Sequence, residues 1–216
     1  LMKFIKIFII LLLSFSCSNK KDIAEFENIL GKENSEMLTY LVSDFENDFL
    51  KRQFPNMSTK KAYNKFLTEL KNENTDFLQK TSKESRKKFE ESNLRLEIYS
   101  IPDSIWIERN PDSLTLQNGV PTLKIRRKYL KSDGTFHHNI SESSYRFKED
   151  INSDSIIETR KNWVDSNWIG KYAKAMNSVS KKSRFMKDYL HIRDAAGTIS
   201  PILVAHKMLD SDVDVS

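Results

Sequence analysis

Two helical stripes joined by a short connection decide the fold. Residues 35–71 read SEMLTYLVSDFENDFLKRQFPNMSTKKAYNKFLTELK. Ser35 can cap a first helix that runs up to Pro55, with apolar residues at the three- and four-residue spacing of one helix face: Leu38, Leu41, Val42, Phe45 and Phe49. Ser58 can open a second helix, whose stripe consists of Ala62, Tyr63, Phe66, Leu67 and Leu70. Because only a few residues join them, we expect an antiparallel helical hairpin.

Further helical patterns flank this hairpin on both sides. A short apolar stripe runs from Asp22 to Leu30 and ends where a glycine follows. Near the other end of the chain, Ser155 can cap a helical segment, and another stripe spans Phe185 to Ile192. Ser200 followed by Pro201 is typical of a helix start, because proline suits the first helical position. The expected fold class is therefore mainly α.

The middle of the chain, about residues 94–150, has a different pattern. Leu94, Leu96 and Ile98 alternate with polar or aromatic residues, which favours a strand. Short apolar patches follow, separated by proline and glycine, and Ser132-Asp133-Gly134 is a turn signal. This segment is either a small meander of short strands or a set of irregular loops, so the alternative fold class is α+β. Only five glycines and five prolines in the chain argue against a sandwich or barrel.

The beginning of the chain has the organisation of an export signal. Lys3 and Lys6 precede the apolar run Ile7–Leu13, and small or polar residues lead from there to Cys17, the only cysteine. A positive end, an apolar middle and a small-residue cleavage zone predict a secretory signal peptide over residues 1–16. The apolar run is about half of the ~20 residues that a stable membrane-spanning helix needs.

The end of this signal, Leu13-Ser14-Phe15-Ser16-Cys17, resembles the lipobox of bacterial lipoproteins. It departs from the usual pattern because Ser14 stands three residues before the cysteine, as in the relaxed boxes of Bacteroidetes-type bacteria. The resemblance implies export in a Gram-negative bacterium, acylation of Cys17 and tethering of the chain to a membrane. Since basic residues, Lys20 and Lys21, follow the cysteine where surface-displayed lipoproteins carry acids, it favours the periplasmic face of the outer membrane.

The charge and the cysteine content limit the functions that the mature chain can have. The net charge is +5, and removal of residues 1–16 takes away two lysines and no acid, which leaves +3. This modest charge and the exported address disfavour nucleic acid as a partner. With Cys17 acylated, neither a disulfide nor a thiol nucleophile remains. We expect a lipid-anchored segment with a short helix over residues 17–33, and one mainly helical domain over residues 34–216.

Two groups of side chains are weak candidates for catalysis or metal binding. Asp188, His191 and Asp194 are three residues apart on an expected helix, so a carboxylate could orient the imidazole as a base. A solvated ion-pair cluster with Arg193 explains the same spacing. His137 and His138 are neighbours on an expected strand and point to opposite faces, so they cannot easily chelate one ion. The sequence therefore predicts no metal site and no cofactor.

Two further features are candidate surfaces. The basic residues Lys124, Arg126, Arg127 and Lys128 could face an anionic membrane surface, or they could simply solubilise the protein. Trp163 and Trp168 could form an aromatic groove, but core packing beside a helix break is the simpler interpretation.

These patterns lead to three functional hypotheses. The first is a non-catalytic binding or assembly component of the cell envelope, tethered through Cys17, with another envelope protein as its partner. The second is an envelope hydrolase that uses the face of Asp188, His191 and Asp194, which would require a buried, convergent His191. The third is a small-ligand carrier, which would require an apolar pocket between helices.

Overall fold

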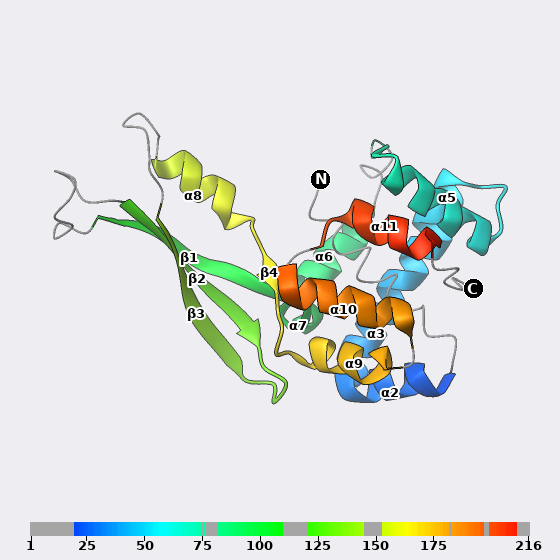
Figure 1. Cartoon of the computed structure of the whole chain (residues 1–216), viewed down its shortest axis with the longest axis horizontal. Helices are drawn as coiled ribbons and strands as arrows, with labels where there is room; N and C mark the ends of the chain where they lie inside the picture. Colours follow the sequence, from blue (N-terminus) through cyan, green and yellow to red (C-terminus); the bar gives the residue numbers. More distant parts are fainter. Residues whose placement is uncertain are drawn as a thin grey trace. The chain divides into compact units, whose positions relative to one another are not determined.

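The computed structural model describes residues 20–74, 76, 82–109, 121–144, 153–181, 183–196 and 199–210. The chain divides into two compact units, a helical unit made of residues up to 95 and from 171 onward, and a sheet unit of residues 96–170. The expected fold class is confirmed, because helices predominate and the middle of the chain forms a small antiparallel sheet (Figure 1). The middle segment, which was expected to belong to a single domain over residues 34–216, forms a compact unit of its own.

The helical unit is built from two separate parts of the chain. The first part contains α2 (Lys20–Leu30), α3 (Lys32–Asp44), the π-helix η1 (Phe45–Leu50), α4 (Lys51–Gln53), α5 (Thr59–Lys71), α6 (Lys83–Glu91) and the start of α7 (Asn93–Ile98). The second part contains α9 (Lys171–Ser180), α10 (Arg184–Ala196) and α11 (Pro201–Asp210). The two parts interleave, because α2 packs on α9 and α5 packs on α11. Helices far apart in the sequence therefore share one core.

Aromatic rings from the hairpin form the centre of that core. Phe45 and Phe49 are stacked with their ring centroids 5.2 Å apart, and Phe66 of α5 meets Phe45 edge-on at 5.1 Å. All three rings are almost fully buried. Such pairs contribute ~0.5–1.5 kcal/mol beyond the burial of their area. The predicted hairpin stripes are thus the surfaces that hold η1 against α5.

The helix that precedes Pro55 differs from the prediction at its start and in the turn formed by η1. Its start lies at Lys32, so Ser35 is inside it, and the Ser35 hydroxyl donates to the carbonyl oxygen of Glu27 at 3.2 Å. Toward its end the backbone widens into η1, where hydrogen bonds join residues five apart. Leu50, the last residue of η1, is buried like Phe45 and Phe49.

The described residues of the sheet unit form four antiparallel strands in the order β3-β2-β1-β4. They are β1 (Tyr99–Arg109), β2 (Pro121–Leu130), β3 (Phe136–Ser144) and β4 (Asp165–Ser166), with α8 (Ser153–Lys161) packed along β1 (Figure 1). The predicted turn at Ser132-Asp133-Gly134 joins β2 to β3. Gly134 has a φ of +84°, which glycine adopts without strain, and Asp133 accepts hydrogen bonds from the backbone and the hydroxyl of Thr135.

Two local predictions in the middle segment need correction. Residues 94–98 belong to helix α7 and not to a strand, because Leu94 and Ile98 are four residues apart and can also share a helix face. Both side chains are buried. The strands that follow are also longer than expected, since β1 continues through Pro102 by means of an irregularity in its register between Pro102 and Ser104.

Candidate interaction surface

The two faces of β2 have opposite character. Leu123, Ile125 and Arg127 are buried on one face, whereas Lys124, Arg126 and Lys128 lie on the other face. The predicted basic cluster is therefore divided by the alternation of the strand. We call the second face the ionic face, and it is formed by Asp103, Glu108, Lys124, Arg126, Lys128, His138 and Glu142.

Lys124 is the centre of one group of charges on the ionic face. Its Nζ forms ion pairs with Glu108 on β1 and with Glu142 on β3, the latter at 3.2 Å. Hydrogen bonds to Glu108 and then to Glu142 raise the pKa of the Lys124 ammonium above its ordinary value. One cation thus links the three long strands.

Asp103 is the centre of a second group. Its Oδ1 accepts from Arg126 Nε at 2.9 Å, and its Oδ2 lies 3.2 Å from His138 Nε2 on β3. The residue lies at the register irregularity of β1, which redirects its side chain across the sheet. Burial raises the pKa of the Asp103 carboxyl, but the hydrogen bond and charge of Arg126, together with His138 and Ser104, outweigh this effect and lower the pKa.

The adjacent histidines have separate surroundings, as the sequence analysis anticipated. His138 faces Asp103, whereas the His137 ring packs edge-on against Tyr129 with centroids 5.4 Å apart. The Ser104 hydroxyl donates a hydrogen bond to Asp103, so the hydroxyl and the His138 imidazole both approach the same carboxylate. Among the described residues, no group of three or more His, Cys, Asp or Glu side chains is arranged to hold a metal ion.

Beside the ionic face, β3 forms an exposed edge of the sheet. Phe136 is 53% exposed and Ile140 is 55% exposed, and both lie on the same face as His138 and Glu142. The ammonium of Lys128 lies 4.0 Å from the centre of the Phe136 ring. Within the described part of the chain β3 pairs only with β2, so main-chain N–H and C=O groups along its other side face outward.

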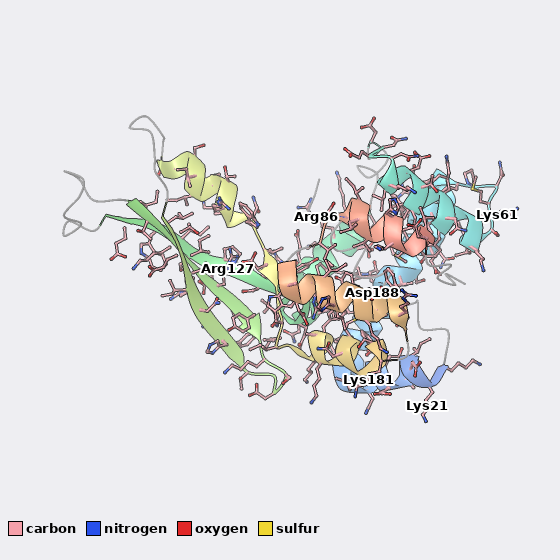
Figure 2. The ribbon with its side chains drawn as sticks, viewed as in Figure 1. Lys21, Lys61, Arg86, Arg127, Lys181 and Asp188 are labelled. Carbon is pink, nitrogen blue, oxygen red and sulfur yellow. The ribbon has the colours of Figure 1, made fainter. Side chains whose placement is uncertain are left out.

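Arg127 is the one member of the basic cluster that is buried. It is 7% exposed and donates to the carbonyl oxygen of Trp163 at 2.8 Å, and its Nε lies 3.0 Å from a carboxylate oxygen of Asp165 (Figure 2). Burial lowers the pKa of its guanidinium, which the charge of Asp165 partly offsets. Arg127 was expected among surface charges, although its alternation with Leu123 and Ile125 is a signal for the buried face. The structure gives it a packing role inside the sheet unit.

The predicted catalytic trio lies on the surface of α10. Asp188, His191 and Asp194 are all exposed, and Asp188 is labelled on this helix in Figure 2. Asp194 lies 3.3 Å from Arg193, whose side chain is buried. The condition set for the hydrolase hypothesis, a buried and convergent His191, is not met.

The ligand-carrier hypothesis requires an apolar pocket between helices. An open depression of about 600 Å³ lies where α2 meets α3, and its lining includes Glu27, Lys32 and Glu36. It is not the apolar pocket between helices that a carrier requires.

The core-packing interpretation of the two tryptophans is wrong, because Trp163 is 45% exposed and Trp168 is 39% exposed. They lie in the connection on either side of β4, where Arg160 covers the Trp163 ring at 3.7 Å.

The predicted lipid attachment at Cys17 and the signal segment before it lie outside the described residues. Within the part of the chain that the structure does describe, no helix has both the length and the apolar character needed to span a membrane.

Comparisons of the chain with protein-family models, curated proteins and solved structures found no match.

Proposed function

We propose that this protein is a lipid-anchored, non-catalytic binding or assembly component of the cell envelope. Residues 3–17 supply the predicted export signal and the acylated Cys17, which would hold the chain at a membrane without a spanning helix. The observation that carries the binding role is the exposed edge of β3. An extended partner segment can add to such an edge as a further strand, with main-chain hydrogen bonds for affinity and side-chain contacts for specificity.

The charges of the ionic face also favour a protein partner over a lipid surface. Three cations, Lys124, Arg126 and Lys128, share the face with three carboxylates, so their formal charges cancel. A lysine or arginine near an anionic membrane contributes about 1 kcal/mol of attraction, but this applies to a cation that is free to face the lipid headgroups. We therefore assign membrane attachment to the acyl group and partner binding to the sheet unit.

The first experiment tests the anchor. The full-length chain and a Cys17→Ala variant are expressed in a Gram-negative host, with Ser18→Ala as the matched control. Intact mass and membrane fractionation should give an acylated, membrane-bound protein for the wild type and the control. The Cys17→Ala variant should lack the added mass and leave the membrane fraction. A wild-type chain that is released into the soluble fraction without acyl groups would overturn the anchor.

The second experiment tests the binding role. A photo-crosslinking amino acid is placed at Ile140 on β3, and in a parallel strain at the exposed Ile202 on α11. Illumination of living cells should give a discrete crosslinked product from position 140 and none from position 202. If position 140 gives no product, the assignment of β3 as the binding edge is wrong.

A further inference from the structure

The β3 strand has few of the features that usually prevent the edges of sheets from pairing, and Glu142 is its one carboxylate. Its sequence, Phe136 to Ser144, reads FHHNISESS and contains no proline, lysine or arginine. Its register with β2 is uninterrupted over nine residue pairs, from Thr122 opposite Ser144 to Leu130 opposite Phe136. Natural edge strands are commonly shortened, bulged or protected by lysine or proline. This edge is long and regular, and it is therefore suited to pair with another strand.

The sequence of β3 is complementary to itself in the antiparallel direction. Two copies that extend one sheet about a two-fold axis perpendicular to it must place residues of the same face opposite one another. With the axis at Ile140, the middle residue of the strand, the full length of β3 is paired. In this register His138 lies opposite Glu142 of the second copy, and Glu142 lies opposite its His138.

We infer that the partner of β3 is a second copy of this chain, which pairs with it antiparallel about a two-fold axis at Ile140. The two four-stranded sheets then form one continuous eight-stranded sheet. The pairing satisfies outward main-chain groups of both edges and buries the exposed Ile140 side chain against its counterpart. The two His138–Glu142 pairs bring opposite charges together when the imidazole is protonated.

This inference rests on the proposed function, because the anchor assists the pairing. Two chains tethered to the same membrane by acylated Cys17 meet at a higher effective concentration than free chains do. Two β3 edges that pair with only moderate affinity in solution can therefore be paired at the membrane.

A charge introduced at residue 140 distinguishes a loss of pairing between two chains from a loss of folding within one chain. Within one chain Ile140 lies opposite Arg126, so Ile140→Glu places a carboxylate beside a guanidinium and keeps the fold. Across the two-fold axis the same substitution places two carboxylates together. Sedimentation velocity of the full-length chain in detergent should give a dimer for the wild type. The Ile140→Glu variant should dimerise at least about tenfold more weakly, with unchanged circular dichroism.

Ile202→Glu is the matched control, because it introduces the same charge at an exposed isoleucine of α11. This control should dimerise like the wild type. A monomeric wild type would overturn the inference, as would equal dimerisation of Ile140→Glu and the wild type.

A disulfide tests the register even if the glutamate variant fails to fold. In the two-fold register the thiol introduced by Ile140→Cys faces the same thiol of the second copy, at a separation that a disulfide can bridge. The thiol introduced by Ser143→Cys faces His137 instead. Oxidation should link the first variant into a covalent dimer above the background of the wild type, whose single cysteine, Cys17, is expected to be acylated. The second variant should stay at that background, and equal crosslinking of both would contradict the register.

The crosslinking experiment at position 140 distinguishes this inference from the proposed function. A product of twice the chain mass supports self-pairing. A product with a different protein overturns self-pairing and leaves the proposed binding role in place, whereas no product overturns both.

Discussion

The side-chain amide of Asn167 donates a hydrogen bond to the carbonyl oxygen of Leu130 at 2.6 Å. The same Nδ2 donates to the carbonyl of Leu96 at 2.8 Å, and the amide oxygen accepts from the backbone N–H of Ile169 at 3.1 Å. Asn167 is 4% exposed, so these bonds form away from water. The Asn167 side chain thus links the end of β2 to Leu96, where the chain enters the sheet unit, and to Ile169, where it leaves.

Replacement of Asn167 by aspartate should destabilise the sheet unit. The change keeps the shape of the side chain but places a carboxylate oxygen against two carbonyl oxygens that have lost their donor. Loss of buried hydrogen bonds of this kind costs about 1–3 kcal/mol. All three tryptophans lie between residues 96 and 170, so the denaturant midpoint followed by tryptophan fluorescence reports on this unit alone. The midpoint should fall.

The control for this prediction is Asn162→Asp, the same substitution at an exposed position of the sheet unit outside β3. Its midpoint should stay close to that of the wild type. If the two variants unfold at the same denaturant concentration, the bonds of Asn167 do not stabilise the unit.

Arg127→Met should also destabilise the sheet unit. Methionine retains much of the apolar stem, but the Trp163 carbonyl loses a charged donor and the Asp165 carboxylate loses its ion pair with the guanidinium. Hydrogen bonds to charged groups contribute ~1.5–3 kcal/mol, and we expect the lower end because Asp165 is half exposed. Lys161→Met, which removes an exposed cation that pairs with Glu158, should change the fluorescence midpoint little. If Arg127→Met leaves the denaturant midpoint unchanged or raises it, packing at this position stabilises the sheet unit without the guanidinium.

The Asp103 carboxyl should make stability depend on pH. Its pKa is lowered in the folded state, so its contribution is present above the unfolded pKa of about 3.9 and is lost as the pH falls through the folded pKa. Because the group is largely exposed, the contribution should be below about 1 kcal/mol. We therefore expect the free energy of unfolding of wild type and Asp103→Asn to differ at pH 7 and to converge near pH 2. A difference that persists unchanged at pH 2 would contradict this prediction.

Tyr63→Phe should destabilise the helical unit by about 1 kcal/mol. The Tyr63 hydroxyl is buried and donates to Glu46 at 2.9 Å, and its burial, followed by the charge of Glu46, raises its pKa. Helical circular dichroism during thermal unfolding measures the change. Glu46→Gln keeps an oxygen acceptor and should lose less stability than Tyr63→Phe. If Glu46→Gln loses more stability than Tyr63→Phe, the hydrogen bond to Glu46 is not the source of the stability that the Tyr63 hydroxyl contributes.

The helices were predictable because their apolar spacing is regular and continuous. The stripes of Phe45, Phe49 and Phe66 identify buried faces without knowledge of the neighbouring helices. The widened turn of η1 was not predictable from the stripe, since the spacing of Phe45 and Phe49 fits a regular α-helix as well. For the same reason, Leu94 and Ile98 fitted a strand as well as a helix until their packing was known.

The candidate surface was only partly predictable. The basic residues of β2 were identified, but their partners, Asp103, Glu108 and Glu142, lie on other strands, and strand pairing cannot be read from one segment. Asn167 was missed because an asparagine between serine and tryptophan is typical of an exposed loop. Its hydrogen bonds to Leu96 and Leu130 join residues 71 and 37 positions away. Only the folded chain brings these groups together.

The division of the helical unit into two chain segments has a consequence for the order of folding. The sheet unit is one continuous stretch, residues 96–170, and can complete its contacts as soon as that stretch is available. The helical unit must wait for its second segment, because α2 needs α9 and α5 needs α11 as packing partners. During synthesis from the N-terminus, the first helices therefore stay incomplete while the later-made sheet matures. Truncation before α11 would leave a finished sheet beside an unfinished helical core.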